Sequence, residues 1–142
     1  MYGALDISTS GLIAQRTRMT VISANLANRN TILDTAGNVN PYKRRHAMFA
    51  PGDPTAKSGA ARELGVHVHT SDINEDAVRL RHQPGSPYAF KDGPNEGYVP
   101  VPDIDPVVEQ VNAMEASRAY EANIAAADAT KTMLAQALRL LA

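Results

Sequence analysis

Three histidines in the middle of the chain have the type and spacing that could do chemistry. His67 and His69 alternate with valines, and alternate residues of a strand share one face. His82, on a second segment of alternating polarity, could complete a facial metal site of the kind that binds zinc. Acidic residues that could add a ligand lie between the two segments: Asp72, Glu75 and Asp76. The simpler interpretation is that these histidines occupy the polar face of a half-buried strand and face solvent.

The sequence also lacks cysteine and the common catalytic sequence motifs. It contains no cysteine, no G-x-S-x-G elbow, no P-loop, no H-E-x-x-H zinc motif and no G-x-G-x-x-G fingerprint. Carboxylates at the density found near the C-terminus normally form a solvated helix face or ion pairs: Glu109, Glu115, Glu121 and Asp128. The sequence therefore predicts a protein that is not an enzyme and uses no cofactor. A small metal-binding or enzymatic module built on the three histidines is the alternative.

A short basic run precedes Met48 and Phe49 and consists of Lys43, Arg44, Arg45 and His46. Nucleic-acid binding would call for a wider basic surface and for aromatic residues that stack on bases. The chain has a net charge of −1, and aromatic residues make up only 5% of it. We therefore expect no nucleic-acid partner. The run is expected to form a solvated strand edge or to pair with charges on a neighbouring subunit.

Membrane insertion is not expected either. No segment approaches the roughly 18 consecutive apolar residues that span a bilayer. The first residues, MYGALDISTSG, lack the basic and apolar regions of a secretory signal peptide. If the protein leaves the cytoplasm, we expect it to do so without a cleavable signal peptide.

The end of the chain predicts one long helix. Asp105 can cap it, Pro106 suits its first position, and neither glycine nor proline follows. A helix of about 36 residues would be about 54 Å long, which is more than a compact domain of this size needs. Apolar residues recur at steps of three and four in two runs: Ile104, Val107, Val111 and Met114, then Tyr120, Ile124, Ala127, Leu134, Leu138 and Leu141. The runs meet through Ser117 in a stammer that is expected to overwind the helix.

The start of the chain predicts a second helix. Its apolar residues recur at seven-residue steps, with one more at an intermediate position: Leu5, Leu12, Met19, Leu26 and Ile22. This is the pattern of a coiled-coil seam, although an ordinary amphipathic helix covering a core fits the same spacing. The chain has no tryptophan and only two phenylalanines. We therefore expect helix packing through small residues rather than around an aromatic core.

The middle of the chain predicts a small, loop-rich β module. Residues 28–41 are rich in Asn, Thr and Gly and predict a long loop, and residues 50–65 predict a flexible one. The alternating segments 65–69 and 76–82 are expected to pair as a hairpin. Prolines are concentrated in residues 83–106, which excludes a central strand there. Such a module is too small to be very stable alone and should lean on the helices.

Motifs at both ends of the chain resemble the signatures of bacterial flagellar rod and hook proteins. The N-terminal signature corresponds to ALDISTSGLIAQRTRMTVISANLANRNT, in which the Asn-x-Ala-Asn-x-x-Thr element falls on Asn25, Ala27, Asn28 and Thr31. The C-terminal signature corresponds to ASRAYEAN, residues 116–123. The segments between them are similar to those of the short proximal-rod members: PYKRRHAMF, GVHV, HQPGSPYA and GYVPVPDIDPVVEQVNAMEASRAYEAN.

The resemblance implies a mainly α fold in which long N- and C-terminal helices pack as a coiled coil around an inserted, loop-rich β module. The corresponding divisions are residues 1–30, 31–101 and 102–142. It also implies a structural subunit that assembles helically with copies of itself into the hollow proximal rod of the flagellar basal body. That rod crosses the periplasm, transmits torque and conducts exported subunits.

The same resemblance implies particular partners and an assembly interface. The partners are other proximal and distal rod proteins, the adaptor between rod and inner-membrane ring, and the flagellar type III export apparatus. The expected interface residues are Leu5, Leu12, Met19, Ile22, Asn25, Leu26, Asn28, Thr31, Val111, Met114, Arg118, Tyr120, Asn123, Ile124, Leu134 and Leu138. We expect Arg118 and Tyr120, which lie in the C-terminal signature, to contact neighbouring subunits.

Overall fold

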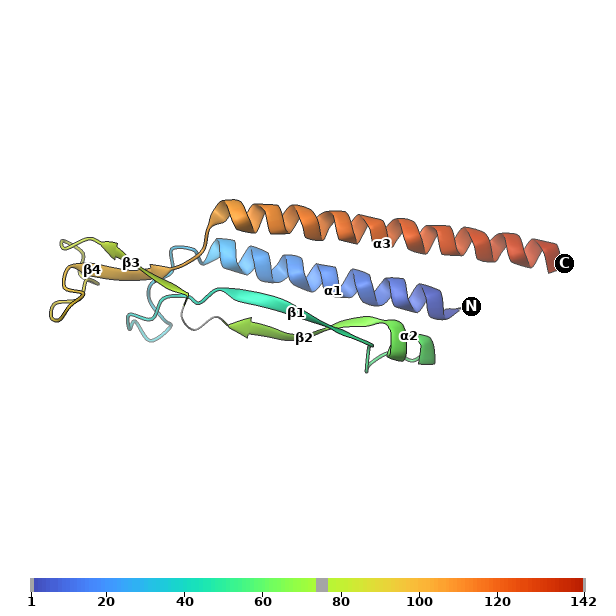
Figure 1. Cartoon of the computed structure of the whole chain (residues 1–142), viewed down its shortest axis with the longest axis horizontal. Helices are drawn as coiled ribbons and strands as arrows, with labels where there is room; N and C mark the ends of the chain where they lie inside the picture. The colour runs from blue at the N-terminus through green and yellow to red at the C-terminus, as the bar shows by residue number, and fades with distance from the viewer. Residues whose placement is uncertain (1, 74–76, 142) are drawn as a thin grey trace.

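Two long helices dominate the computed structural model, which describes residues 2–73 and 77–141 (Figure 1). In chain order the elements are α1 (Tyr2–Ala27), β1 (Arg45–Pro51), α2 (Gly59–Leu64), β2 (Val66–Ile73), β3 (Val78–His82), β4 (Tyr98–Pro102) and α3 (Pro106–Leu141). Helices α1 and α3 lie side by side and run in opposite directions. The β1–β2 hairpin lies along the other side of α1, and the β3–β4 hairpin lies beyond the helices, away from both chain termini. The predicted pair of long terminal helices with a small β module between them is confirmed.

The start of α3 is capped as its sequence predicts. The Asp105 carboxylate accepts a hydrogen bond from the backbone N–H of Val107 at 2.8 Å. The Asp105 carbonyl accepts the N–H of Glu109 at 3.1 Å. Pro106 is the first helical residue, where a missing N–H costs no hydrogen bond. Local sequence alone is therefore sufficient to place this helix end.

Small residues bring α1 and α3 close together, as predicted. Ala116 of α3 is 0% exposed. Gly11 is also buried, and a Cβ built on it would lie 2.8 Å from the Asn123 side-chain amide. An α-carbon without a side chain lets the partner helix approach closely at this point. Asn123 therefore packs where a larger residue at position 11 would exclude it.

The C-terminal end of α3 extends past the start of α1. Asn25 bonds to Glu109, and Gly11 lies against Asn123. In this antiparallel register, a residue one position later on α1 lies opposite a residue one position earlier on α3. At this register Tyr2 lies opposite position 132, which leaves residues 133–141 without α1 beside them. The apolar side chains of this overhang are exposed: Met133 62%, Leu138 59% and Leu140 87%.

In the isolated chain, residues 133–141 are expected to exchange their amide hydrogens far faster than residues 109–123 of the same helix. Most helical stability in proteins comes from tertiary packing, and the overhang lacks it. Hydrogen exchange followed by mass spectrometry measures both segments in one sample, so residues 109–123 are the internal control. Equal protection of the two segments would contradict this prediction.

The predicted pairing of residues 65–69 with residues 76–82 is wrong. Strand β2 pairs with β1 in one antiparallel sheet, and β3 pairs with β4 in another. The sequence pattern shows two alternating strands but not which strand each pairs with. Strand β4 contains Pro100 and Pro102, which a two-stranded sheet tolerates because each strand has an outer edge. The expectation that the proline-rich segment forms no central strand is therefore consistent with the fold.

Residues 50–65 are not the continuous flexible loop that their composition predicts. They include the last residues of β1 and the short helix α2. The Ser58 hydroxyl caps α2 by accepting the backbone N–H of Ala61 at 3.3 Å. Ala61 is 1% exposed because α2 packs against α1. Burial of this alanine stabilises a helix of six residues that would be too short to persist alone.

Gly65→Ala is expected to destabilise the chain by about 2 kcal/mol, because overpacking forces backbone shifts. A Cβ on Gly65 would overlap the backbone carbonyl oxygen of Ala61 and would lie 3.1 Å from the Ser10 hydroxyl. Urea unfolding followed by circular dichroism measures the change. The control is Gly85→Ala, where no atom lies within 4 Å, and a change within about 0.5 kcal/mol is expected. Equal effects of the two substitutions would show that the close contact with the Ala61 carbonyl does not destabilise the Gly65→Ala variant.

Within the described residues, neither long helix has a stretch apolar enough to cross a lipid bilayer. The long helices carry small and polar residues through their middles, and Glu109, Glu115 and Glu121 lie along α3.

Candidate functional site: a buried polar junction and an outward apolar face

Asn25 lies at the centre of a buried junction between α1, α3 and β1. It is 1% exposed. Its side-chain NH2 donates to the backbone carbonyl of Arg45 at 2.9 Å and to Glu109 Oε2 at 3.1 Å. Its side-chain oxygen accepts the backbone N–H of Arg45 at 3.0 Å and the Tyr42 hydroxyl at 3.2 Å. One side chain thereby joins both long helices to the start of the first strand.

Glu109 supplies the charge of the junction. It is 1% exposed, and its Oε1 accepts hydrogen bonds from Arg44 Nε at 2.9 Å and Arg44 Nη2 at 2.5 Å. A buried carboxylate is tolerated only when it is paired and hydrogen-bonded. Arg44 and Asn25 together meet that condition. The junction therefore fixes how α3 sits against α1 and β1.

The rest of the N-terminal signature shapes the end of α1. The Asn28 side-chain NH2 donates to the carbonyl of Ala24 at 2.9 Å, and the Asn28 backbone N–H donates to the same carbonyl at 3.1 Å. The Thr31 hydroxyl donates to the Asn28 side-chain oxygen at 3.2 Å. Asn28 and Thr31 thus satisfy backbone and side-chain groups where the helix ends, as terminal carbonyls require.

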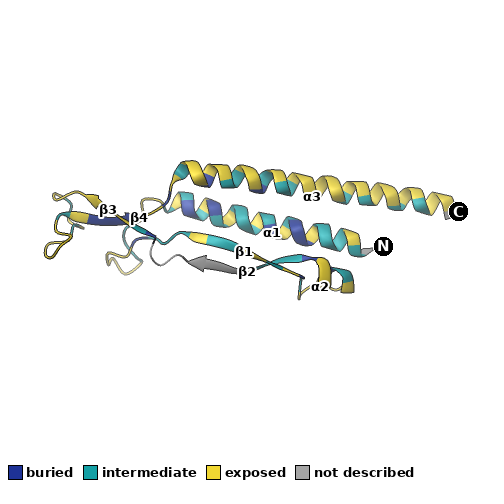
Figure 2. Ribbon diagram, viewed as in Figure 1, coloured by how far each residue is buried: buried dark blue, intermediate teal, exposed yellow. Residues whose placement is uncertain are grey.

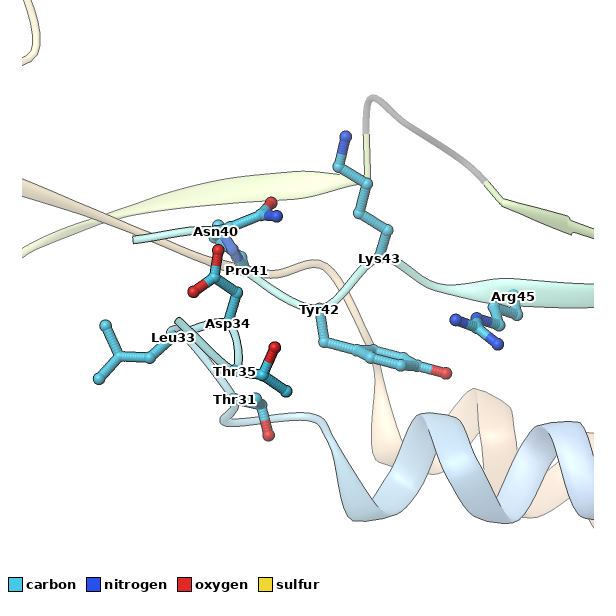
Figure 3. A pocket seen from close by; sticks show the side chains of 9 residues that line it. All are labelled: Thr31, Leu33, Asp34, Thr35, Asn40, Pro41, Tyr42, Lys43 and Arg45. Carbon is cyan, nitrogen blue, oxygen red and sulfur yellow. The ribbon is translucent and has the colours of Figure 1, made fainter. Parts of the chain in front are cut away.

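An open depression lies beside this helix end, with a volume of about 520 Å³ (Figure 3). Its lining residues come from the loop after α1 and the start of β1: Thr31, Leu33, Asp34, Thr35, Asn40, Pro41, Tyr42, Lys43 and Arg45. The Asp34 carboxylate is occupied by the backbone N–H groups of Ala36 and Asn38, each at 2.9 Å. The Arg45 guanidinium lies 5.7 Å from the centre of the Tyr42 ring. These groups stabilise the loop and form no catalytic arrangement.

Helix α3 turns its small and polar residues toward α1. Beside α1, the buried and half-buried positions include a series at steps of three and four: Glu109, Ala113, Ala116, Tyr120, Asn123, Ala127 and Thr130. Met114, through which the predicted stammer passes, is 55% exposed and lies outside this series. Tyr120 and Ala127 of the second predicted run are half-buried, whereas Val107, Val111 and Met114 of the first run are exposed. Alanine and asparagine face α1 because larger side chains would hold the two backbones apart.

Bulky apolar residues at the start of α3 are exposed. Figure 2 shows that exposed positions recur along the whole of α3. The exposed fractions are 66% for Val107, 45% for Val108, 44% for Val111 and 55% for Met114. We call these four residues the outward apolar face. A contiguous exposed apolar patch marks an interaction surface more often than chance exposure does.

The predicted stripe on α1 lies partly inside the fold. Ile22 is 5% exposed. The other members are half-buried: Leu5, Leu12, Met19 and Leu26. Leu12 and the half-buried Tyr120 of α3 line one small cavity, together with Thr9, Ile13 and Arg16.

The other predicted interface residues are spread along α3. Arg118 is exposed, and Ile124 is 41% exposed. Leu134 is half-buried, and Leu138 lies in the exposed overhang. Glu115 pairs with Arg18 of α1 at 3.3 Å, and both side chains reach solvent. The structure thus brings Asn25 and Ile22 into the interior and leaves Val111, Met114, Arg118, Ile124 and Leu138 open.

The three histidines do not converge. His67 and His69 belong to the β1–β2 sheet, with their rings 6.1 Å apart, whereas His82 belongs to the β3–β4 sheet. The pairing that would have brought His82 beside them is the wrong hairpin described above. His67 Nδ1 lies 2.5 Å from the carbonyl of Gly52, and the His82 ring packs 5.0 Å from that of Tyr98. No group of three or more potential metal ligands occurs in the described parts of the chain, and the side chains of Asp72, Glu75 and Asp76 lie outside them.

Sequence reasoning misses the partners of Asn25. The pattern places Glu109 on a solvated face, and Arg44 in a strand edge or an intersubunit pair. A usable signal is present, since Glu109 lies among apolar residues one turn inside the helix and would need a cation if buried. Which of the neighbouring basic residues supplies it depends on how β1 approaches α3. Lys43 and Arg45 are also cationic, so spacing cannot select Arg44.

Comparison with known proteins identifies both ends of the chain. The family model described as "Flagella basal body rod protein" matches residues 5–32. "Flagellar basal body rod FlgEFG protein C-terminal" matches residues 95–140. Flagellar basal-body rod protein FlgC of Borreliella burgdorferi is 33% identical over 99% of this chain and 97% of its own. The proteins of that name from Bacillus subtilis and Salmonella typhimurium are 36% and 35% identical, over 98% and 99% of this chain and 97% of their own. The chain therefore belongs to the FlgC family of flagellar basal-body rod proteins.

Proposed function

We propose that this chain is a structural subunit of the bacterial flagellar basal-body rod. The relatives from Borreliella, Bacillus and Salmonella are named as rod proteins and match over nearly their whole length. The polar side chains of the junction bond to one another: the Glu109 carboxylate accepts hydrogen bonds from Asn25 and Arg44, so it serves a structural role. The protein works by assembling with other subunits.

The outward apolar face is the single observation that carries this proposal. Val107, Val108, Val111 and Met114 are all at least 44% exposed on a helix whose inner side holds alanine and asparagine. Fully burying one such side chain contributes about 1.5–3 kcal/mol, so covering the four residues at an interface would contribute several kcal/mol. A face that meets a different surface on the next copy makes a heterologous contact, and heterologous contacts can build open helical filaments.

In the assembled form, α1 and α3 act as a two-helix coiled coil, and the loop-rich segment between them faces outward. The functional divisions are residues 1–30, 31–101 and 102–142. Copies stack helically into the hollow proximal rod, which crosses the periplasm, transmits torque and conducts exported subunits. All of the interface residues predicted from the sequence serve this assembly, including Arg118 and Tyr120 of the C-terminal signature.

The partners follow from the same role. They are further copies of the chain, other proximal and distal rod proteins, the adaptor to the inner-membrane ring and the type III export apparatus that delivers the subunit. Both α1 and α3 keep exposed positions along their lengths after they have packed together, and this supports the proposal because neighbouring subunits can contact those positions.

Complementation of a motile bacterium that lacks its own rod gene of this family tests the proposal. Expression of this chain is expected to restore swimming, and electron microscopy of isolated basal bodies is expected to show the chain in the rod by immunolabelling. An empty vector is the negative control, and the strain's own gene is the positive one. Labelling outside the rod, or restored motility without any label in the basal body, would overturn the assignment.

A further inference from the structure

The outer edge of β3 is open. Antiparallel pairs alternate between residues that bond to their partner strand and residues whose backbone groups point away. Gln83 donates to the Gly97 carbonyl at 2.9 Å, so in the same register Arg79 and Arg81 bond toward β4. Leu80 therefore directs its N–H and C=O to the outer side. Within residues 2–73 and 77–141, no group bonds to either of them.

The outer edge of β4, by contrast, is closed to a further strand. Pro100 and Pro102 have no N–H, so they cannot donate to a neighbour. The Tyr98 carbonyl already accepts the N–H of Phe90 at 3.0 Å, and the Tyr98 N–H already donates to Asn95 at 3.0 Å. Proline is one of the ways in which proteins prevent an edge strand from pairing. The two edges of the same small sheet thus differ, and only the β3 edge can accept a strand.

Charge selects what the β3 edge can accept. Arg79 and Arg81 are exposed, share one face of the strand, and form no ion pair with any described residue. A second copy pairing antiparallel about Leu80 would place Arg79 opposite Arg81, and like charges directly opposite are destabilising. A strand with carboxylates at alternate positions would instead place one beside each arginine.

We propose that β3 binds an extended acidic segment of another protein, which adds to the sheet as a third strand. The bound segment forms backbone hydrogen bonds with Leu80 and its neighbours, and its carboxylates at positions i and i+2 pair with Arg79 and Arg81. This is strand addition, in which the backbone supplies affinity and alternate side chains supply specificity. The site lies at the end of the molecule away from the chain termini, where the helices do not cover it (Figure 1). It does not depend on the role of α1 and α3 in the rod.

Fluorescence anisotropy with the purified full chain tests the proposal. The probe is a labelled nine-residue peptide in which aspartate alternates with valine and threonine, and the control probe has lysine in place of aspartate. The aspartate peptide is expected to bind saturably and at least about tenfold more tightly than the lysine peptide, and the difference should shrink at high salt. Equal binding of the two peptides, or no binding of either, overturns the proposal.

Two variants separate strand addition from simple charge attraction. Leu80→Pro removes the outward N–H and leaves the β4 side of the ladder intact, and it is expected to weaken aspartate-peptide binding about tenfold. The double variant Arg79→Glu and Arg81→Glu keeps the open backbone edge of β3 and reverses its charge. It is expected to bind the lysine peptide more tightly than the aspartate peptide, and that binding also shows that the variant is folded. Arg139→Glu, an exposed reversal on α3, is the control and should change nothing. Unchanged affinity in Leu80→Pro, or a double variant that binds neither peptide while circular dichroism shows native helix content, overturns strand addition.

Discussion

Glu109→Ala is expected to destabilise the folded chain by about 3 kcal/mol. Removing one partner of a buried charged pair leaves the other charge uncompensated, which typically costs several kcal/mol. In this fold two side chains lose their hydrogen-bond acceptor, because Arg44 and the side-chain NH2 of Asn25 both bond to the Glu109 carboxylate. Arg44 keeps some contact with solvent, since its side chain is 24% exposed, and this limits the loss. Urea unfolding at 25 °C, followed by circular dichroism, measures the change in the free energy of unfolding.

Glu115→Ala is the matched control for this prediction. Glu115 also lies on α3 and also pairs with an arginine of another element, but the side-chain exposures are 61% for Glu115 and 28% for Arg18. Exposed ion pairs contribute about 0–1 kcal/mol. Glu109→Gln should fall between the two, because an amide keeps an acceptor but loses the charge. If Glu109→Ala and Glu115→Ala change stability equally, the junction does not hold the helices in place.

The double variant Val111→Glu and Met114→Glu is expected to abolish incorporation into the rod while the isolated chain keeps its stability. The two side chains are 44% and 55% exposed, so the monomer loses little packing. Within α3 the glutamate at position 111 is repelled by Glu115 and by the glutamate at position 114, whereas the latter is attracted by Arg118. Each of these helix-surface interactions amounts to about 0.2–0.5 kcal/mol, so the isolated chain loses little stability. In an assembled interface the same two carboxylates would be desolvated without partners. That costs about 3 kcal/mol for each contact, which is more than a hundredfold in affinity.

Swimming assays and labelled basal bodies measure incorporation in a strain that this chain complements, and circular dichroism of the purified variant measures stability. The control places two glutamates at exposed positions of the same helix that carry no bulky apolar side chain, Ala129 and Gln136. This control is expected to swim normally. A Val111 and Met114 variant that still assembles would show that the outward apolar face is not the assembly surface.

Much of the fold could be predicted because its signals are local. Asp105 and Pro106 mark where α3 begins. No glycine or proline follows within the helix, so no residue interrupts it before its end. Capping and propensity act within one or two turns, so the sequence alone states them. Short-range turn chemistry is equally readable at Asp34 and Gly37, where Gly37 has a φ of +84° that other residues rarely adopt. Ser58 carries the same kind of signal for α2, although the Pro- and Gly-rich composition around it predicts a loop.

Strand partners and helix faces were decided only by the tertiary structure. Alternation shows that a segment is a strand, but its partner depends on contacts between segments far apart in the sequence, which is why β2 pairs with β1 and β3 with β4. Likewise, the apolar steps on α3 place Val111 and Met114 on one stripe but do not show whether that stripe packs against α1. In the structure both residues are exposed, and small residues such as Ala116 are buried instead.

Asn25 is recognisable as part of a signature, but its structural role cannot be read from spacing. Its partners at positions 42, 44, 45 and 109 meet only when the two helices and the first strand have packed. The sequence by itself determined where the long helices lie, because capping and propensity are local. The tertiary structure decided which of their faces are used inside the chain and which remain for another molecule, because that choice depends on how closely distant segments can approach.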